Sequence, residues 1–90
     1  DAGRAVEALK RAIELAPREP KAWFRRGRMK YANGDYKGAE ADFSEAVVVS
    51  PANAEFVLNR AFARAALGRR AEAIADLETA LRIAPGNSRK

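Results

Sequence analysis

The chain repeats itself with a period of 34 residues. Six classes of residue recur in register across three copies, with no gap between the copies. They are Ala5, Ala39 and Ala73; Leu9, Phe43 and Leu77; Ala12, Ala46 and Ala80; Ile13, Val47 and Leu81; Leu15, Val49 and Ile83; and Pro17, Pro51 and Pro85. An ordinary helical bundle has amphipathic helices, but not one fixed period with a proline closing each unit. The period therefore predicts a stacked array of helical repeats.

One complete unit spans residues 20–53. Its characteristic residues are, in order, Trp23, Gly27, Gly34-Asp35-Tyr36, Ala39, Phe43, Ala46 and Pro51. This order and spacing resembles the tetratricopeptide repeat, a helix-turn-helix unit of 34 residues. The resemblance implies an all-α fold, a right-handed α-solenoid of antiparallel helix pairs. It also implies a concave face lined mainly by the first helix of each pair.

Hydrophobic periodicity and breaker residues predict five helices, at residues 2–16, 20–33, 36–49, 54–67 and 70–83. Residues 1–19 correspond to the second helix of a partial repeat, 20–53 and 54–87 to full repeats, and 88–90 to the start of a further helix. Pro20 suits a first helical turn, Gly34 a turn with positive φ, and Asp35 a helix cap. We therefore expect one domain, a fragment of a longer array.

Several residues are assigned to packing within a repeat. Glycine inside a helix costs about 1 kcal/mol relative to alanine, so Gly27 predicts a close approach of the partner helix. Trp23 is assigned to the same interface. Arg26 and Arg60 stand where the family usually has leucine, and Arg64 where it usually has tyrosine. We expect these arginines to bury their stems and keep their charged heads in water.

Charge is unevenly distributed along the chain, which has a net charge of +5. Residues 20–33 contain five Lys or Arg and no acid, whereas residues 34–50 contain four acids and one lysine. A cationic helix therefore lies beside an acidic one.

The resemblance places two sets of side chains on the concave face. By helical spacing, these are Lys21, Phe24, Arg25, Arg28 and Tyr31 in one repeat, and Glu55, Leu58, Asn59, Phe62 and Ala65 in the next. Arginine binds carboxylates through paired hydrogen bonds, and the aromatic rings offer flat apolar area. We expect a protein-interaction module that binds an extended, acidic peptide of a partner protein in this groove.

A narrower resemblance concerns the carboxylate-clamp tetratricopeptide domains, which hold the acidic C-terminus of cytosolic chaperones. Lys21 and Arg25 match their Lys-x-x-x-Arg segment, and Asn59-Arg60 matches their Asn-Arg pair. The two repeats stand in the reverse order, however, and Phe24 and Arg28 replace the first clamp pair. Arg89 would take the later lysine position. The match to the clamp is therefore partial.

Two other classes of function stay open. The basic helix at 20–33, with Trp23, Phe24 and Tyr31 between its charges, could bind RNA or another polyanion. The acidic helix that follows, within residues 34–50, argues against binding of a polyanion. A purely structural role is the third possibility, in which the open ends of the array self-associate or pack on further repeats.

Composition argues against an enzyme. The chain has no cysteine and no histidine, which removes disulfides, thiolate chemistry and the commonest general base. Asp42 with Glu45, and Asp76 with Glu78, are expected to be exposed carboxylates without a metal-ligand pattern; Glu72 and Asp76 could at most bind a cation weakly. We expect no metal, no cofactor and no membrane insertion. The N-terminus does not resemble a signal peptide, and a cytoplasmic location is expected.

Overall fold

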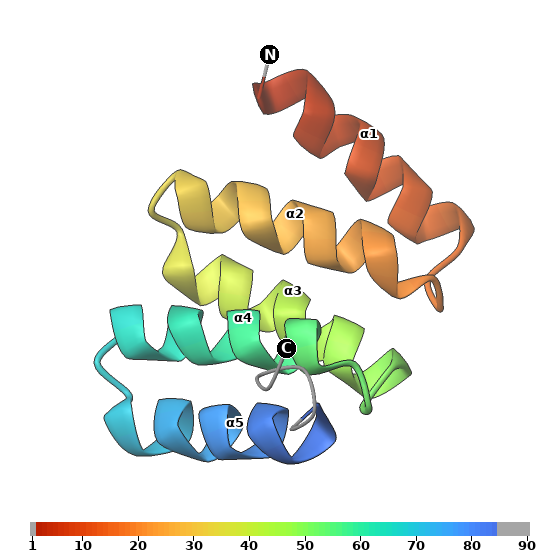
Figure 1. The fold of residues 1–90 in the computed structure, drawn as a ribbon. Coiled ribbons are helices and arrows are strands. Elements are labelled where there is room, and N and C mark those ends of the chain that lie inside the picture. Colours follow the sequence, from red (N-terminus) through yellow and green to blue (C-terminus); the bar gives the residue numbers. More distant parts are fainter. Residues whose placement is uncertain (1, 85–90) are drawn as a thin grey trace.

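Five α-helices follow one another along residues 2–84, the part of the chain that the computed structural model describes. They are α1 (Ala2–Leu15), α2 (Pro20–Ala32), α3 (Tyr36–Val49), α4 (Ala54–Ala66) and α5 (Arg70–Ile83) (Figure 1). All five predicted helices are confirmed, with ends within one residue of the expected positions. Pro85 and the predicted helix start at 88–90 lie outside the described residues. Within residues 2–84, no helix has the length and apolar character needed to cross a membrane.

Local signals in the sequence account for where α2 and α3 begin and how the turn between them forms. Pro20 stands at the start of α2, as predicted. Gly34 has a φ of 87°, which only glycine adopts readily, and it separates α2 from α3. The Asp35 carboxylate accepts a hydrogen bond from the backbone N–H of Gly38 at 2.9 Å, which caps α3. These turn and cap predictions are therefore confirmed.

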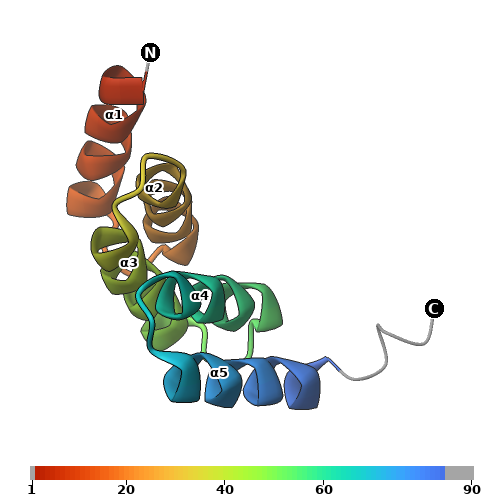
Figure 2. The same cartoon turned by 90° about the vertical axis from the view of Figure 1, so that its left-hand side faces the viewer.

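The helices form two layers of a curved array. α2 packs on α3 and α4 packs on α5, while α1 contacts α2 and α3 contacts α4. Figure 2 shows α2 and α4 on the inner side of the curve, and α1, α3 and α5 along its outer side. The first helix of each pair therefore lines the concave side, as the resemblance implied.

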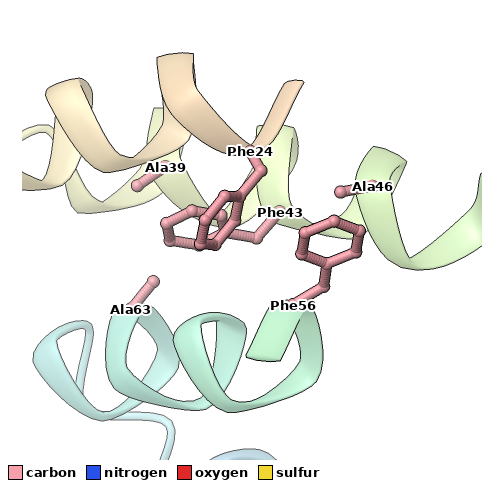
Figure 3. Close-up of a cluster of buried hydrophobic side chains, with 6 residues drawn as sticks. All are labelled: Phe24, Ala39, Phe43, Ala46, Phe56 and Ala63. Atoms are coloured by element: carbon pink, nitrogen blue, oxygen red, sulfur yellow. The ribbon is translucent and has the colours of Figure 1, made fainter. Parts of the chain in front are cut away.

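The main core crosses the boundary between the two repeats. It contains Phe24, Ala39, Phe43, Ala46, Phe56 and Ala63 (Figure 3). The Phe24 ring centroid lies 5.7 Å from that of Phe43 and 4.9 Å from that of Phe56. Because Phe56 belongs to the second repeat, the two repeats share this core. A single hairpin of this size could not bury such a face alone.

Gly27 packs directly against side chains of α3, in agreement with its predicted packing role. A Cβ atom added to it would lie 2.7 Å from Cε1 of Phe43 and 3.2 Å from Cβ of Asp42. Both neighbours are buried, so neither has free space into which to move. Glycine is therefore required here by the helix-helix distance.

Two carboxylates predicted to be exposed are instead buried. Asp42 is 2% exposed and Asp76 is 5% exposed. Arg26 donates from Nε and Nη2 to the two oxygens of Asp42 at 2.8 and 2.9 Å. Arg60 donates in the same way to Asp76, at 3.0 Å for both bonds. The carboxylates can be buried because the guanidinium fork satisfies both oxygens of each.

The prediction that these arginine heads remain in water is therefore wrong. Each guanidinium points into the interface between the two helices of its own repeat, where it pairs with a carboxylate. Hydrogen bonding to Asp42 outweighs burial and raises the pKa of Arg26 above its ordinary value. An ion pair thus occupies the space that a leucine would fill in a typical repeat.

Arg64 connects the two repeats electrostatically. Its Nη1 lies 3.0 Å from Asp76 in its own repeat, and its Nε lies 2.8 Å from Glu40 on α3. Arg69 adds a second contact to Glu40 at 2.6 Å. Burial by itself would raise the pKa of Glu40, but the hydrogen bonds from Arg64 and Arg69 outweigh it and lower that pKa. The ionised form of Glu40 therefore stabilises the contact between repeats.

We expect the substitution Glu40→Gln to weaken the dependence of stability on acid. Because the pKa of Glu40 falls from its ordinary 4.5 on folding, its stabilisation is fully present above that value and disappears as the pH falls through the lowered pKa. Melting temperatures are measured by circular dichroism from neutral to acidic pH. Near neutral pH the wild type should have the higher melting temperature, and in acid the two melting temperatures should converge. Glu45→Gln, an exposed change on the same helix, is the control. A constant difference between wild type and Glu40→Gln at every pH would contradict this role.

Candidate functional site

A small hollow opens between α2 and α4, on the inner side of the array. Its volume is about 220 Å³, and Phe43 of α3 contributes to its lining. The other lining residues are Arg28, Tyr31, Ala32, Asn59 and Phe62. Tyr31 and Phe62 are 37% and 47% exposed, so their rings are accessible to a ligand. The hollow therefore combines apolar walls with one cationic and one amide side chain.

A second, shallower hollow of about 430 Å³ lies beside it, between α1 and α2. Leu9, Arg25, Arg28, Met29 and Ala32 line this hollow. Arg28 lines both spaces, and its Cζ lies 5.8 Å from the centroid of the Phe24 ring. Contact with the ring face helps to position the guanidinium between the two hollows.

The five basic residues of α2 divide into two groups. Arg26 and Lys30 both pair with Asp42 and belong to the interface with α3. Lys21, Arg25 and Arg28 are exposed, and none of them pairs with a carboxylate anywhere in residues 2–84. These three cations therefore remain free to meet an anionic ligand.

The structure brings together four of the ten residues predicted for the concave face, Arg28, Tyr31, Asn59 and Phe62, around one hollow. Arg25 lines the adjacent hollow, and Lys21 is exposed near the start of α2.

Phe24 and Leu58 lie elsewhere. Phe24 is only 8% exposed and belongs to the core between the repeats. Leu58 lines a different hollow, between α4 and α5. Neither residue therefore lines the hollow between α2 and α4.

Sequence reasoning missed four lining residues, Leu9, Met29, Ala32 and Phe43 of α3. Met29 and Ala32 follow Arg25 and Arg28 by four residues, so helical spacing alone could have found them. They were passed over because they carry no charge or ring. Leu9 could not be found in this way, because its place depends on how α1 packs against α2.

One of the residues that match the carboxylate clamp, Arg60, is not available to a ligand in the structure. Arg60 uses its guanidinium fork on Asp76, so its charged group faces α5 and not the ligand side. Asn59 remains at the inner hollow, where its Nδ2 donates to the backbone carbonyl of Glu55 at 2.8 Å. Arg89 lies outside the described residues.

The aromatics proposed to stack on nucleic acid are mostly engaged elsewhere. Trp23 packs partly against the core, and its Nε1 donates to the carbonyl of Pro17 at 2.9 Å. Phe24 is buried. Tyr31 is therefore the exposed member of the three.

The two carboxylates on α5 suggested as a weak cation site, Glu72 and Asp76, already lie next to arginine side chains. Asp76 is bound by Arg60 and Arg64. Across residues 2–84, no group of three or more acidic residues has the arrangement needed to hold a metal ion.

Comparison with known proteins places these features in a family. The family profile described as tetratricopeptide repeat matches residues 1–48 and 27–88. Protein FlbA of Caulobacter vibrioides is 36% identical over 83 residues, which is 92% of this chain and 14% of that protein. The TPR repeat-containing thioredoxin TTL4 of Arabidopsis thaliana is 34% identical over 87 residues, which is 97% of this chain and 12% of that protein. The chain thus spans a small part of the length of these relatives.

Solved structures show the same arrangement of helices. The crystal structure of MamA matches with a TM-score of 0.90 at 21% identity, over 99% of this chain and 52% of that one. The second TPR of Spaghetti (RPAP3), bound to the HSP90 peptide SRMEEVD, matches with a TM-score of 0.87 at 27% identity, over 91% of this chain and 76% of that one. YrrB, described as a TPR protein with an unusual peptide-binding site, matches with a TM-score of 0.87 at 25% identity, over 97% and 45%. The chain belongs to the tetratricopeptide repeat family.

Proposed function

We propose that the chain binds an extended, acidic segment of a partner protein along the inner side of α2 and α4, without catalysing a reaction. The observation that carries this proposal is the set of three unpaired cations, Lys21, Arg25 and Arg28, beside the hollow walled by Tyr31 and Phe62. The fold uses the other two basic residues of α2 for its own stability. Within residues 2–84, none of the three forms an ion pair with a carboxylate.

The chemistry of this surface suits a peptide with carboxylates near an apolar side chain. The guanidinium groups of Arg25 and Arg28 can each bind a carboxylate through two hydrogen bonds. A bulky apolar side chain between the carboxylates could enter the hollow next to Arg28, where Tyr31 and Phe62 would contact it. Because Arg28 lines both hollows, it can take part both in binding a carboxylate and in contacting the apolar side chain.

The comparisons support a peptide ligand. The second TPR of Spaghetti (RPAP3) is bound to the peptide SRMEEVD, which contains two glutamates, an aspartate, a methionine and a valine. YrrB is described as having an unusual peptide-binding site. Both resemble this chain over more than nine-tenths of its length.

We expect the double substitution Arg25→Ala with Arg28→Ala to weaken binding of an acidic peptide at least several-fold. Each charge-assisted hydrogen bond to a carboxylate contributes roughly 1.5–3 kcal/mol, so the loss should be readily measured. SRMEEVD is a suitable probe, with affinity measured by isothermal titration calorimetry at two salt concentrations. The far-ultraviolet circular dichroism should not change, because both side chains are exposed.

A matched control separates specific recognition from net charge. Arg11→Ala with Arg18→Ala removes the same charge from two exposed positions away from both hollows. This control should bind the peptide nearly as well as the wild type at moderate salt. Equal losses in the two double variants would show that general electrostatics, and not the groove, holds the peptide. Tighter binding of a single-stranded RNA than of any acidic peptide would favour the polyanion alternative.

A further inference from the structure

Only one of the two helical walls of the inner groove has unpaired positive charge among residues 2–84. α2 and α4 form these walls (Figure 2). On α2, Arg25 and Arg28 are three residues apart, so they lie on the same side of the helix, and both are exposed. The basic residues of α4 are Arg60 and Arg64, and both are bound to carboxylates of α3 or α5. The groove can therefore hold anionic groups along α2 and not on its α4 side.

The other two polar side chains of α4 provide no positive charge. Asn59 lines the hollow of about 220 Å³, and its Nδ2 donates to the backbone carbonyl of Glu55 at 2.8 Å. Glu55 lies one helical turn before Asn59, on the same side of α4, and is exposed. Its carboxylate repels a second carboxylate placed beside it. An acidic ligand therefore has its charged groups next to α2 and an apolar or uncharged part next to α4.

Backbone N–H groups do not replace the missing charge. Every residue that lines the two hollows beside Arg28 lies beyond the first turn of its helix, so its N–H group donates within that helix. In residues 2–84, positive φ values occur only at Gly34 and Gly68, which lie in turns and line neither hollow. The described part of the groove thus lacks the backbone nest or helix N-terminus that can hold a terminal carboxylate.

On the basis of the binding function proposed above, we propose that the groove takes an internal acidic segment of its partner. It recognises side-chain carboxylates and does not need a free C-terminal carboxylate. Each guanidinium group can hold one carboxylate through two hydrogen bonds, so Arg25 and Arg28 together accommodate two. A chain end has a single terminal carboxylate, and therefore at least one of the two comes from a side chain. This mode differs from a carboxylate clamp, because Arg60, the matching residue on α4, binds Asp76 instead.

Three peptides distinguish side-chain carboxylates from the terminal one. SRMEEVD has adjacent glutamates and a free C-terminus. SRMEEVDGS has the same net charge, but its terminal carboxylate is displaced by the added Gly-Ser. SRMQQVD retains the terminal carboxylate and lacks the glutamate charges. In isothermal titration calorimetry at moderate salt, SRMEEVDGS should bind the wild type within about twofold of SRMEEVD, and SRMQQVD at least about fivefold more weakly.

Variants of the chain show which side chains bind the glutamates. In Arg25→Ala with Arg28→Ala, SRMEEVD and SRMQQVD should bind within about twofold of each other, because the glutamates have lost their partners. In the control Arg11→Ala with Arg18→Ala, which removes the same charge from exposed positions away from both hollows, the two peptides should still differ at least about fivefold. Circular dichroism checks that both double variants remain folded.

The outcomes separate this proposal from the binding function on which it rests. A loss of affinity of more than about fivefold from SRMEEVD to SRMEEVDGS would overturn the internal-segment proposal alone, since the groove would then hold a chain terminus. A difference between SRMEEVD and SRMQQVD that persists undiminished in Arg25→Ala with Arg28→Ala would also overturn it, because the glutamates would then be bound elsewhere. If none of the three peptides binds the wild type, the proposed function fails, and the internal-segment proposal fails with it.

Discussion

Replacing Gly27 with leucine should destabilise the fold by at least about 3 kcal/mol, the upper end of what overpacking usually costs. Even a Cβ atom at this position would lie 2.7 Å from the ring of Phe43, which is 1% exposed and surrounded by the shared core. A leucine side chain can be accommodated only if α2 and α3 separate. Urea unfolding and the melting temperature measure the effect, at roughly 4–8 °C per kcal/mol for a domain of this size. An unchanged melting temperature would show that the helices do not approach closely at Gly27.

The second repeat supplies the control for this prediction. At the positions equivalent to Gly27 and Phe43 it has Ala61 and Leu77, a larger residue opposite a smaller one. We therefore expect Gly27→Ala and Phe43→Leu to be coupled when combined. The double variant should be more stable than the sum of the two single effects predicts, by about 1 kcal/mol. Strictly additive effects would argue that Phe43 is not the side chain that excludes a Cβ atom.

Replacing Asp42 with alanine should be comparably severe, with an expected loss of about 3–5 kcal/mol. The substitution leaves Arg26 and Lys30 without their shared carboxylate, and the guanidinium group of Arg26 is largely enclosed by the two helices. An unpaired charge in such a place is much more costly than the loss of a surface ion pair. Chemical unfolding of Asp42→Ala beside Glu45→Ala, an exposed acid on the same helix, isolates the effect of burial. Glu45→Ala should change the free energy of unfolding by no more than about 0.5 kcal/mol.

Replacing both members of the Arg26–Asp42 ion pair should destabilise the fold much less than removing Asp42 alone. Arg26 occupies a position where this family usually has leucine, so Arg26→Leu with Asp42→Leu exchanges the ion pair for apolar contacts. Such exchanges are often neutral or stabilising, because two charges no longer have to leave water. The double variant should therefore recover most of the stability lost in Asp42→Ala. A double variant as unstable as Asp42→Ala would mean that the lost stability does not come from an uncompensated charge.

The features that were predictable depend on short-range rules. Helix limits follow from prolines and glycines that act within one turn, as Pro20 and Gly34 do. The 34-residue period identifies which faces are buried, because a residue in one repeat has the same neighbours as its counterpart in the next. Gly27 was interpretable for the same reason, since a helix accepts glycine at a cost only where something else requires it.

Contacts between side chains of different helices could be identified only from the three-dimensional structure. Asp42 and Asp76 look like solvent-facing acids in the sequence, since a charged residue is rarely buried unless it is paired. Their partners Arg26 and Arg60 lie 16 residues earlier, on another helix, and their orientation depends on how the two helices cross. Phe24 was assigned to the groove for a similar reason. A helical wheel gives the direction of a side chain, but it does not say which neighbouring helix lies there.

By itself, then, the sequence determined the type of fold, the extent of each helix and the sharing of one core between neighbouring repeats. These depend on backbone preferences and on the periodic placement of apolar residues, both of which are local. Only the tertiary structure decided which charges stabilise the fold and which remain for a ligand. Those outcomes depend on distances of a few ångströms between helices, because burial and pairing of a charge are properties of its surroundings and not of the residue alone.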